Sequence, residues 1–191
     1  MSSLAPKAVF GMGNPGEQYA GTRHNSGYMV VDRLAGEFAK GTWHRECLSL
    51  VRGVRFGETS VLLVKPLTFV NRSGEALQRL IEKYGLGAAD VILVLDDFNL
   101  PFGRLRIRKT GSAGGHNGLE SVIRMLGTEE VIRVRLGIGE ESMPADKAGF
   151  VLEDFRPERS SDLGEMIARA GDAVKMIVSD GVAKAMSLFN G

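Results

Sequence analysis

Hydrophobic and polar residues alternate along the chain between patterns typical of strands and patterns typical of helices. Period-two alternation or short apolar runs predict strands at residues 7–12, 47–56, 59–65, 91–97, 103–109 and 131–139. Apolar residues at helical spacing predict helices at residues 26–40, 71–84, 117–126 and 160–180, with a short helix ending at 189. This order predicts an α/β fold in which residues 1–191 form one domain, with a mixed, mainly parallel sheet flanked by helices.

The first predicted strand runs into "GMGNPG", which contains the G-x-G-x-x-G spacing of a dinucleotide-binding turn at Gly11, Gly13 and Gly16. In that motif a helix must begin within the glycines, so that its N-terminus faces a pyrophosphate. Pro15 and the polar residues 17–27 instead predict about ten residues of loop before helical periodicity starts. The pattern favours an active-site loop over a nucleotide site, and its polar residues are Asn14, Tyr19, Arg23, His24 and Asn25.

Composition narrows the class of protein. The chain has 191 residues, 43% of them hydrophobic, and its 24 basic residues nearly balance 23 acidic ones, so a nucleic-acid contact would need local clustering of charge. One cysteine, Cys47, excludes an internal disulfide, and neither a signal peptide nor a membrane-spanning run is present. We expect a soluble, cytoplasmic protein. The histidines and the cysteine follow no metal-binding spacing, so we expect no metal and no cofactor.

Acid–base chemistry is the first candidate function. His24 lies in the loop after the first strand, and Asp96, with Asp97 behind it, ends the apolar run 91–97. A carboxylate that orients a histidine makes the imidazole a general base. The alternative is that both acids simply end a strand in solvent. No G-x-S-x-G elbow is present, so attack by an activated water on a bond such as an ester is the simpler hypothesis.

Three asparagines come from separate predicted loops: Asn14, Asn71 and Asn117. Their amides can grip a peptide backbone or stabilise an oxyanion. Asn71 and Asn117 precede helical sequence and are equally well explained as N-caps. The sequence leaves these two alternatives open.

Basic residues cluster between Pro101 and Thr110. This segment holds four cations and no acid, with Arg104, Arg106 and Arg108 on one face of the predicted strand, and "RVR" adds Arg133 and Arg135. Such arginines can coat a solvated face. Their position after the aspartate loop and before "KTGSAGGHNG" instead favours phosphate binding beside the reaction centre.

Five ordered motifs carry a resemblance to a known family: "GNPGEQYAGTRHNSG", "PLTFVNRSG", "LDDFNLPFGRLRIRKTGSAGGHNGL", "RVRLGIG" and "FVLEDF". Together they resemble bacterial-type peptidyl-tRNA hydrolases over residues 7–189. The resemblance implies a metal-free, monomeric enzyme with a twisted mixed sheet, which cleaves the ester between a peptide and the terminal ribose of tRNA. Val70 and Asn99 depart from the usual methionine and acid of the family.

The resemblance also implies roles for single residues. His24 would be the base that activates water, Asp96 would orient it, and Asn14 would help to distinguish peptidyl from aminoacyl substrates. Tyr19, Phe69, Asn71 and Asn117 would line the site for the peptide and the tRNA end. The clamp for tRNA phosphates would consist of Arg108 and Arg135, helped by Arg106 and Lys109. Two rivals remain: a noncatalytic RNA-binding relative, similar to chloroplast splicing factors, and a nucleotide-dependent oxidoreductase.

Overall fold

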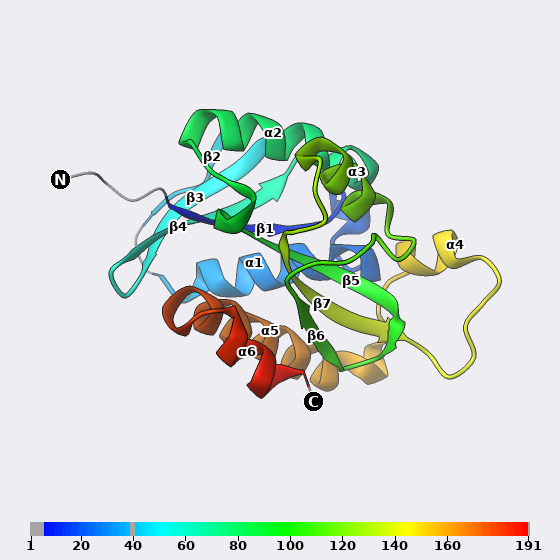
Figure 1. The fold of residues 1–191 in the computed structure, drawn as a ribbon. Coiled ribbons are helices and arrows are strands. Elements are labelled where there is room, and N and C mark those ends of the chain that lie inside the picture. Colours follow the sequence, from blue (N-terminus) through cyan, green and yellow to red (C-terminus); the bar gives the residue numbers. More distant parts are fainter. Residues whose placement is uncertain (1–5, 39–40, 191) are drawn as a thin grey trace.

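The computed structural model describes residues 6–38 and 41–190, which form one seven-stranded sheet with helices on both faces (Figure 1). The strand order across the sheet is β2-β3-β4-β1-β5-β7-β6. The strands are β1 (Lys7–Gly11), β2 (His44–Glu46), β3 (Ser49–Phe56), β4 (Thr59–Pro66), β5 (Val91–Pro101), β6 (Leu105–Arg108) and β7 (Ile132–Gly139).

Pairing in the sheet is parallel at its centre and antiparallel towards its edges. Strand β1 pairs in parallel with β4 and β5, and β5 pairs in parallel with β7. The hairpin β3–β4 and the pairs β2–β3 and β6–β7 are antiparallel. The prediction of a mixed sheet is confirmed, but parallel pairing is confined to the four central strands.

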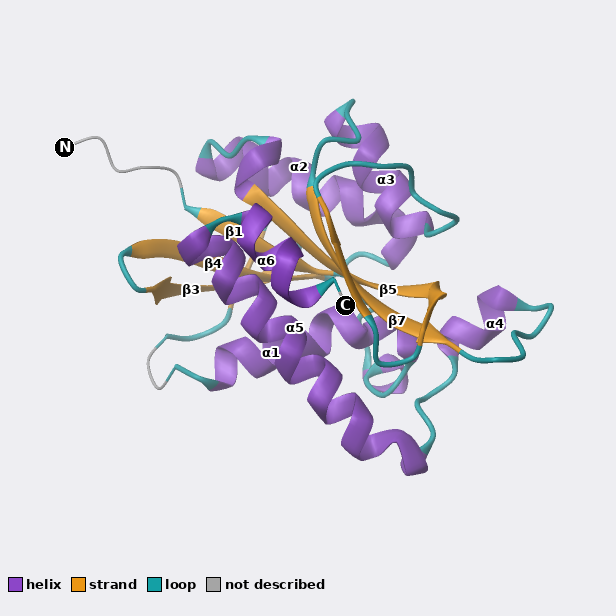
Figure 2. Cartoon of the chain, turned by 60° about the horizontal axis from the view of Figure 1, so that its bottom comes forward, coloured by secondary structure: helices purple, strands orange, loops and turns teal. Residues whose placement is uncertain are grey.

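Two layers of helices cover the sheet, and Figure 2 shows them on opposite sides of it. The helices are α1 (Ser26–Gly36), α2 (Ser73–Tyr84), α3 (Asn117–Leu126), α4 (Lys147–Leu152), α5 (Ser160–Asp180) and α6 (Val182–Phe189). Helices α1, α5 and α6 pack on one face, around Leu34, Met166 and Val174, whereas α2 and α3 pack on the other, around Leu77 and Leu119. Alternate residues of β5 feed the two cores, because successive side chains of a strand point to opposite faces.

The structure departs from the expected boundaries in several places. Helix α1 ends at Gly36, so the predicted helix 26–40 is too long, and residues 39–40 lie outside the described part of the chain. Cys47 is not in a strand: with Leu48 it forms the turn between β2 and β3, at φ 51 and 52. Strand β2 and helix α4 were not predicted, because their 3 and 6 residues are too few to show a period.

Close packing explains two glycines of the first loop. A Cβ on Gly11 would lie 2.4 Å from the Gly27 carbonyl oxygen, and a Cβ on Gly27 would lie 2.4 Å from that of Val94. The start of α1 therefore lies directly against the ends of β1 and β5. Helix α1 starts at Ser26, ten residues after Gly16, so the prediction of an intervening loop is confirmed and the helix cannot open on a phosphate held by these glycines.

None of the helices in the described part of the chain is both long and apolar enough to span a membrane.

Candidate active site

The site lies where one central strand outlasts its neighbour. Pairing of β1 with β5 ends at Gly11 and Val94, after which the Met12 N–H donates to the Val94 carbonyl at 2.9 Å. Strand β5 continues, paired with β7 alone, so the flank of Asp96 that β1 would cover is left open. The expectation that Asp96 ends a strand is therefore corrected: Asp96 lies within β5, beside the end of β1. The cavity that forms there is about 740 Å³.

A single turn of 3₁₀ helix, η2 (Arg23–Asn25), brings His24 to this opening. The side chain of Asn25 fastens the turn to the loop after β1, because its NH₂ donates to the Asn14 carbonyl at 3.0 Å and its Oδ1 accepts from the Asn14 N–H at 2.8 Å. The imidazole of His24 is thus held at the mouth of the cavity before any substrate arrives.

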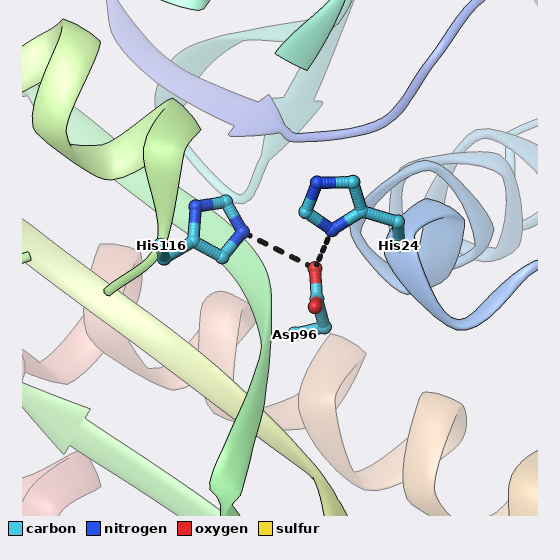
Figure 3. Close-up of side chains that lie close together, drawn as sticks. All are labelled: His24, Asp96 and His116. Atoms are coloured by element: carbon cyan, nitrogen blue, oxygen red, sulfur yellow. Dashed lines mark hydrogen bonds and ion pairs between the residues drawn. The ribbon is translucent and has the colours of Figure 1, made fainter. Parts of the chain in front are cut away.

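Two imidazoles converge on one carboxylate oxygen (Figure 3). His24 Nδ1 lies 2.9 Å from Asp96 Oδ1, and His116 Nε2 lies 3.2 Å from the same atom. Their ring centroids are 5.0 Å apart. Asp96 is 2% exposed, so its charge is stabilised by these donors rather than by water.

The hydrogen-bond partners assign the proton on each ring. His116 is the N-cap of α3, and its Nδ1 accepts from the Leu119 N–H at 3.1 Å, so its proton lies on Nε2, facing Asp96. The carboxylate likewise requires a proton on Nδ1 of His24. The Nε2 atom of neutral His24 is then left with its lone pair, as a general base requires.

Electrostatics favour the charged form of both partners. Burial alone would lower the pKa of His24, but the charge of Asp96 and the hydrogen bond to it outweigh burial and raise the pKa above 6.5. Burial alone would raise the pKa of Asp96, yet His24 and His116 hold it well below the usual range. The carboxylate therefore stays ionised and stabilises the imidazolium that forms when His24 takes up a proton.

The same three residues are also of the kind that could hold a metal ion. One ligand atom from each of His24, Asp96 and His116 lies within 4.8 Å of the others. A metal would need lone pairs where the hydrogen bonds place protons, and the Leu119 N–H opposes the other tautomer of His116. The geometry fits an acid–base cluster better than a metal site.

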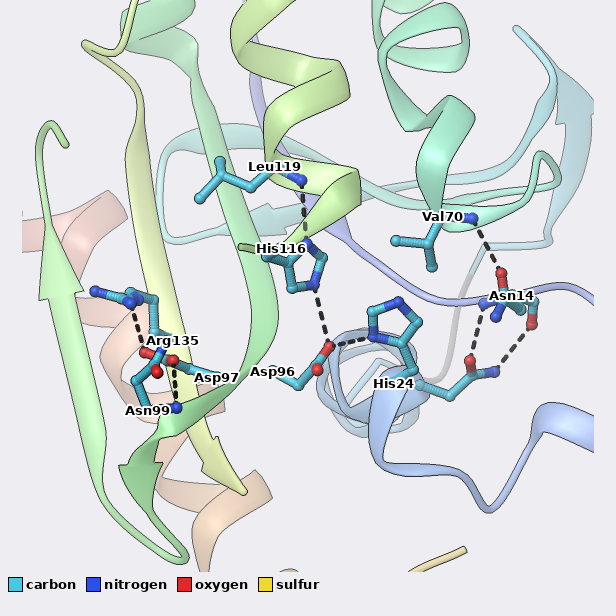
Figure 4. A network of polar contacts seen from close by, with 10 residues as sticks. Asn14, His24, Val70, Asp96, Asp97, Asn99, His116, Leu119 and Arg135 are labelled. Atoms are coloured by element: carbon cyan, nitrogen blue, oxygen red, sulfur yellow. Dashed lines mark hydrogen bonds and ion pairs between the residues drawn. The ribbon is translucent and has the colours of Figure 1, made fainter. Parts of the chain in front are cut away.

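Asn14 is oriented by the backbone of the loop before α2. Its Oδ1 accepts from the Val70 N–H at 3.0 Å, and Figure 4 shows this contact beside His24. This bond identifies which atom of the Asn14 amide is the oxygen. Because Asn14 lines the cavity, its NH₂ group is then the donor available to a ligand. The residue 70 backbone N–H makes the contact, so valine in place of methionine does not disturb it.

The cavity gathers the other predicted binding residues. Tyr19 and Phe69 meet edge to face with ring centroids 6.3 Å apart, and Phe69 is 54% exposed. Asn71 and Asn117 also line the cavity. Neither asparagine is an N-cap: Asn71 lies inside the 3₁₀ turn η3 (Val70–Arg72), and His116 caps α3. The capping alternative is therefore wrong for both.

The basic residues line up across β6 and β7, on the face that carries α3. Arg106 lies opposite Arg135, and Arg108 lies opposite Arg133. Arg133 is buried and its guanidinium binds backbone carbonyls of the glycine-rich loop and of residues 129 and 131. Arg135 Nη2 forms an ion pair with Asp97 Oδ2 at 2.7 Å, which links it to the residue after Asp96 (Figure 4).

The cluster and the basic residues adjoin at Arg135, which lines a small hollow together with Asp96 and His116. None of Arg106, Arg108, Lys109 and Arg135 lines the large cavity, whereas Arg135 lies beneath the glycine-rich loop, 3.5 Å from where a Cβ on Gly114 would be. Repulsion between facing arginines is unfavourable unless an anion relieves it.

Sequence reasoning missed two parts of the site. It left His116 without a role, although this histidine lies in the segment "KTGSAGGHNG", which follows the arginines expected beside the reaction centre. It also missed the wall that α4 contributes through Lys147, Ala148, Val151 and Leu152. The motif "FVLEDF" was the available signal for this wall, since it overlaps the end of α4.

The structure is that of an α/β protein in which two histidines contact one buried aspartate beside a cavity, and comparison with known proteins identifies its family. The family model described as peptidyl-tRNA hydrolase matches residues 8–191. A peptidyl-tRNA hydrolase of Desulforudis audaxviator (strain MP104C) is 44% identical over 184 residues, covering 96% of this chain and 93% of the relative. One of Solibacter usitatus (strain Ellin6076) is 42% identical over 180 residues, covering 94% and 92%.

A solved structure agrees with these sequences. The crystal structure of peptidyl-tRNA hydrolase from Acinetobacter baumannii superposes with a TM-score of 0.90 at 28% identity, covering 100% of this chain and 98% of that chain. The chain belongs to the peptidyl-tRNA hydrolase family.

Proposed function

We propose that this enzyme hydrolyses the ester bond of peptidyl-tRNA with a water molecule activated by His24, and that Asp96 orients and charges the base. The observation that carries the proposal is the contact between His24 Nδ1 and the buried Asp96, 2.9 Å long, which leaves Nε2 as the free proton acceptor at the cavity mouth. Positioned proton transfer of this kind accelerates a reaction by about 10² to 10⁴.

The reaction proceeds in two steps, the addition of water to the ester and the departure of tRNA. His24 Nε2 takes a proton from water while the water oxygen bonds to the ester carbonyl carbon, and negative charge develops on the carbonyl oxygen. The intermediate then collapses and the bond to the ribose oxygen breaks. The departing oxygen takes the proton from His24, so tRNA leaves with a free hydroxyl group and the peptide leaves as a carboxylic acid.

The cavity asparagines bind the acyl part of the substrate. The NH₂ group of Asn14 is directed by its Val70 contact, and the amides of Asn71 and Asn117 reach the same cavity from η3 and from the start of α3. An amide donor matched to a peptide carbonyl selects a peptidyl ester over an aminoacyl ester, because the latter lacks that carbonyl. Tyr19 and Phe69 contribute an aromatic surface for the peptide and the tRNA end.

The stripe of cations Arg106, Arg108, Lys109 and Arg135 binds tRNA phosphates. Arg106 lies opposite Arg135, whose charge Asp97 already balances. The exposed Arg108 and Lys109 are therefore the cations most available to phosphates. Phosphate contacts of this kind position RNA without reading its sequence.

The direct test is cleavage of an N-acetylated aminoacyl-tRNA. The wild-type protein should release free tRNA, and His24→Ala should lose about 10² to 10⁴ of the rate while retaining tRNA binding. Equal rates for the two proteins would refute the role of His24. Binding without cleavage by the wild type would identify a noncatalytic RNA-binding relative instead, and tight dinucleotide binding would favour the oxidoreductase.

Three further properties belong to this proposal. A monomer with residues 1–191 as one domain is part of the proposal, because His24, Asp96 and His116 of a single chain already complete the cluster. If the enzyme is a monomer, light scattering should give the mass of one chain, 20.6 kDa. Since its substrate arises during translation, the enzyme would act in the cytoplasm.

A further inference from the structure

The turn that carries His24 is fixed by a different element at each of its three residues. Asn25 binds the loop after β1 through Asn14, and His24 binds β5 through Asp96. Arg23, the residue before the proposed base, binds the carboxyl end of α4, whose other side lines the cavity. The third contact has no assigned role.

Arg23 supplies further donors to carbonyls at the end of α4, where the Phe150 carbonyl also accepts from the Glu153 N–H at 3.3 Å. Arg23 Nη1 donates to the Phe150 carbonyl at 3.1 Å and to the Glu153 carbonyl at 3.3 Å, and its backbone N–H donates to the same Glu153 carbonyl at 3.0 Å. The last carbonyls of a helix have no partner within the helix, so a cation there is well placed. The guanidinium also stacks 4.1 Å from the centre of the Phe150 ring.

The burial of Arg23 shows that stability alone does not account for it. The residue is 3% exposed, and its one carboxylate partner, Glu153 at 3.2 Å, is 67% exposed and therefore offsets little of the desolvation cost. An apolar side chain of similar length would fill the same space without that cost. The guanidinium adds directed bonds, and those bonds connect the His24 turn to the cavity wall.

Neighbouring backbone contacts bring the same two segments together. Thr22 pairs with Asp154 in an antiparallel bridge, and the Phe155 N–H donates to the Gly21 carbonyl at 3.2 Å. The segment after α4 therefore runs beside the segment before His24. The Arg23 side chain extends this pairing into α4 itself, through the Phe150 carbonyl.

We infer that Arg23 is a positioning residue: by capping the carboxyl end of α4 it fixes the distance between His24 and the cavity wall formed by Val151 and Leu152. The inference rests on the proposed role of His24 as the base. Arg23 itself does not line the large cavity, so it acts through its neighbours. Loss of its bonds lets the turn move, and a shift of about 1 Å at a catalytic group can cost about 10²-fold in rate.

The test compares Arg23→Met, Arg23→Lys and the control Arg159→Met. A second hollow, apart from the active-site cavity, is lined by both Arg23 and Arg159. Arg159 binds Glu140 at 3.4 Å and stacks over Phe102, and among the described residues it makes no hydrogen bond or ion pair with the His24 turn. The measurements are kcat and KM for an N-acetylated aminoacyl-tRNA, and the NMR signal of the His24 Nδ1 proton.

Arg23→Met should lower kcat about 10- to 100-fold with KM changed less than about twofold, and should shift or broaden the His24 signal while leaving that of His116 in place. Arg23→Lys should recover part of kcat, because an ammonium reaches one carbonyl but not the full set. Arg159→Met should match the wild type. If Arg23→Met fails to fold, Arg23→Lys carries the test, with a severalfold fall in kcat and a moved His24 signal.

A wild-type kcat and an unmoved His24 signal in the folded Arg23 variants would overturn the inference. So would equal losses in Arg23→Met and Arg159→Met. The NMR signal reports the position of His24 even if no protein cleaves the ester. Failure of the proposed function and failure of the Arg23 inference therefore give different results.

Discussion

The acid–base cluster and the basic stripe lie on the same protein but are built in opposite ways. In the cluster, a carboxylate that is 2% exposed accepts hydrogen bonds from two imidazole rings at up to 3.2 Å, so its geometry is set before substrate binds. In the stripe, Arg108 and Lys109 are exposed. Burial makes the first region directional and insensitive to salt, whereas exposure makes the second adaptable and strongly screened.

This difference predicts which parameter each substitution changes. A change in the cluster should lower kcat at any ionic strength, because it alters the base that contacts the reacting water or the groups that orient this base. A change in the stripe should raise KM and should matter less as salt increases, because its contribution is long-range attraction.

The largest effect should come from Asp96→Asn. An amide keeps the size of the side chain but removes the charge that stabilises imidazolium and the acceptor that sets the His24 tautomer. We expect kcat to fall by about 10² to 10⁴, measured by ester cleavage at saturating substrate. A kcat within a few-fold of the wild type would mean that Asp96 does not orient the base.

Asn14→Asp should come next. A carboxylate still accepts from the Val70 N–H, so the loop stays in place, but the NH₂ donor to the substrate is lost. We expect a loss of up to about 10²-fold in kcat/KM for N-acetylated aminoacyl-tRNA. Unacetylated aminoacyl-tRNA should be affected less, and an equal loss for both esters would argue against a contact to the peptide carbonyl.

His116→Asn should have an intermediate effect. Asparagine is a good N-cap, so α3 should keep its start, but the second donor to Asp96 is removed. We expect kcat to fall about tenfold, in keeping with the loss of one charge-assisted hydrogen bond. His44→Asn is the matched control, because His44 is exposed and contacts Thr42. A kcat for His116→Asn equal to that of this control would limit His116 to capping.

Arg108→Ala should give the smallest effect. We expect KM for tRNA substrates to rise severalfold at low salt, and the slope of log affinity against log salt to fall by about 1, as for the loss of one phosphate contact. A tRNA-free ester should be cleaved normally. Arg55→Ala removes an exposed arginine on β3 and serves as control. An equal loss on the tRNA-free ester would contradict the phosphate role.

The sequence predicts these two regions to different degrees. Alternation of Leu105 and Ile107 with arginines placed the stripe correctly, since a period of two is a local property. The pairing of His24 with Asp96 was expected from chemistry and resemblance, and the structure brings the two together. The role of His116 depends on a turn after a glycine-rich loop and on a helix cap, and neither leaves a periodic signal.

The open flank beside Asp96 and the wall from α4 could not be predicted from the sequence. The open flank beside Asp96 exists because β1 ends at Gly11 while β5 continues to Pro101, and no local pattern reports where a neighbouring strand ends. The wall from α4 is a helix of only six residues, too short to show amphipathic spacing.

The pH dependence of kcat/KM, compared between the wild type and Asp96→Asn, tests the central claim most directly. Neutral His24 is the active form, so kcat/KM should rise with pH through an inflection above 6.5, because Asp96 raises the pKa of His24 in the free enzyme. Without that charge, burial dominates and the inflection should move to lower pH as kcat/KM falls. An inflection that stays at the same pH in both proteins would contradict the account.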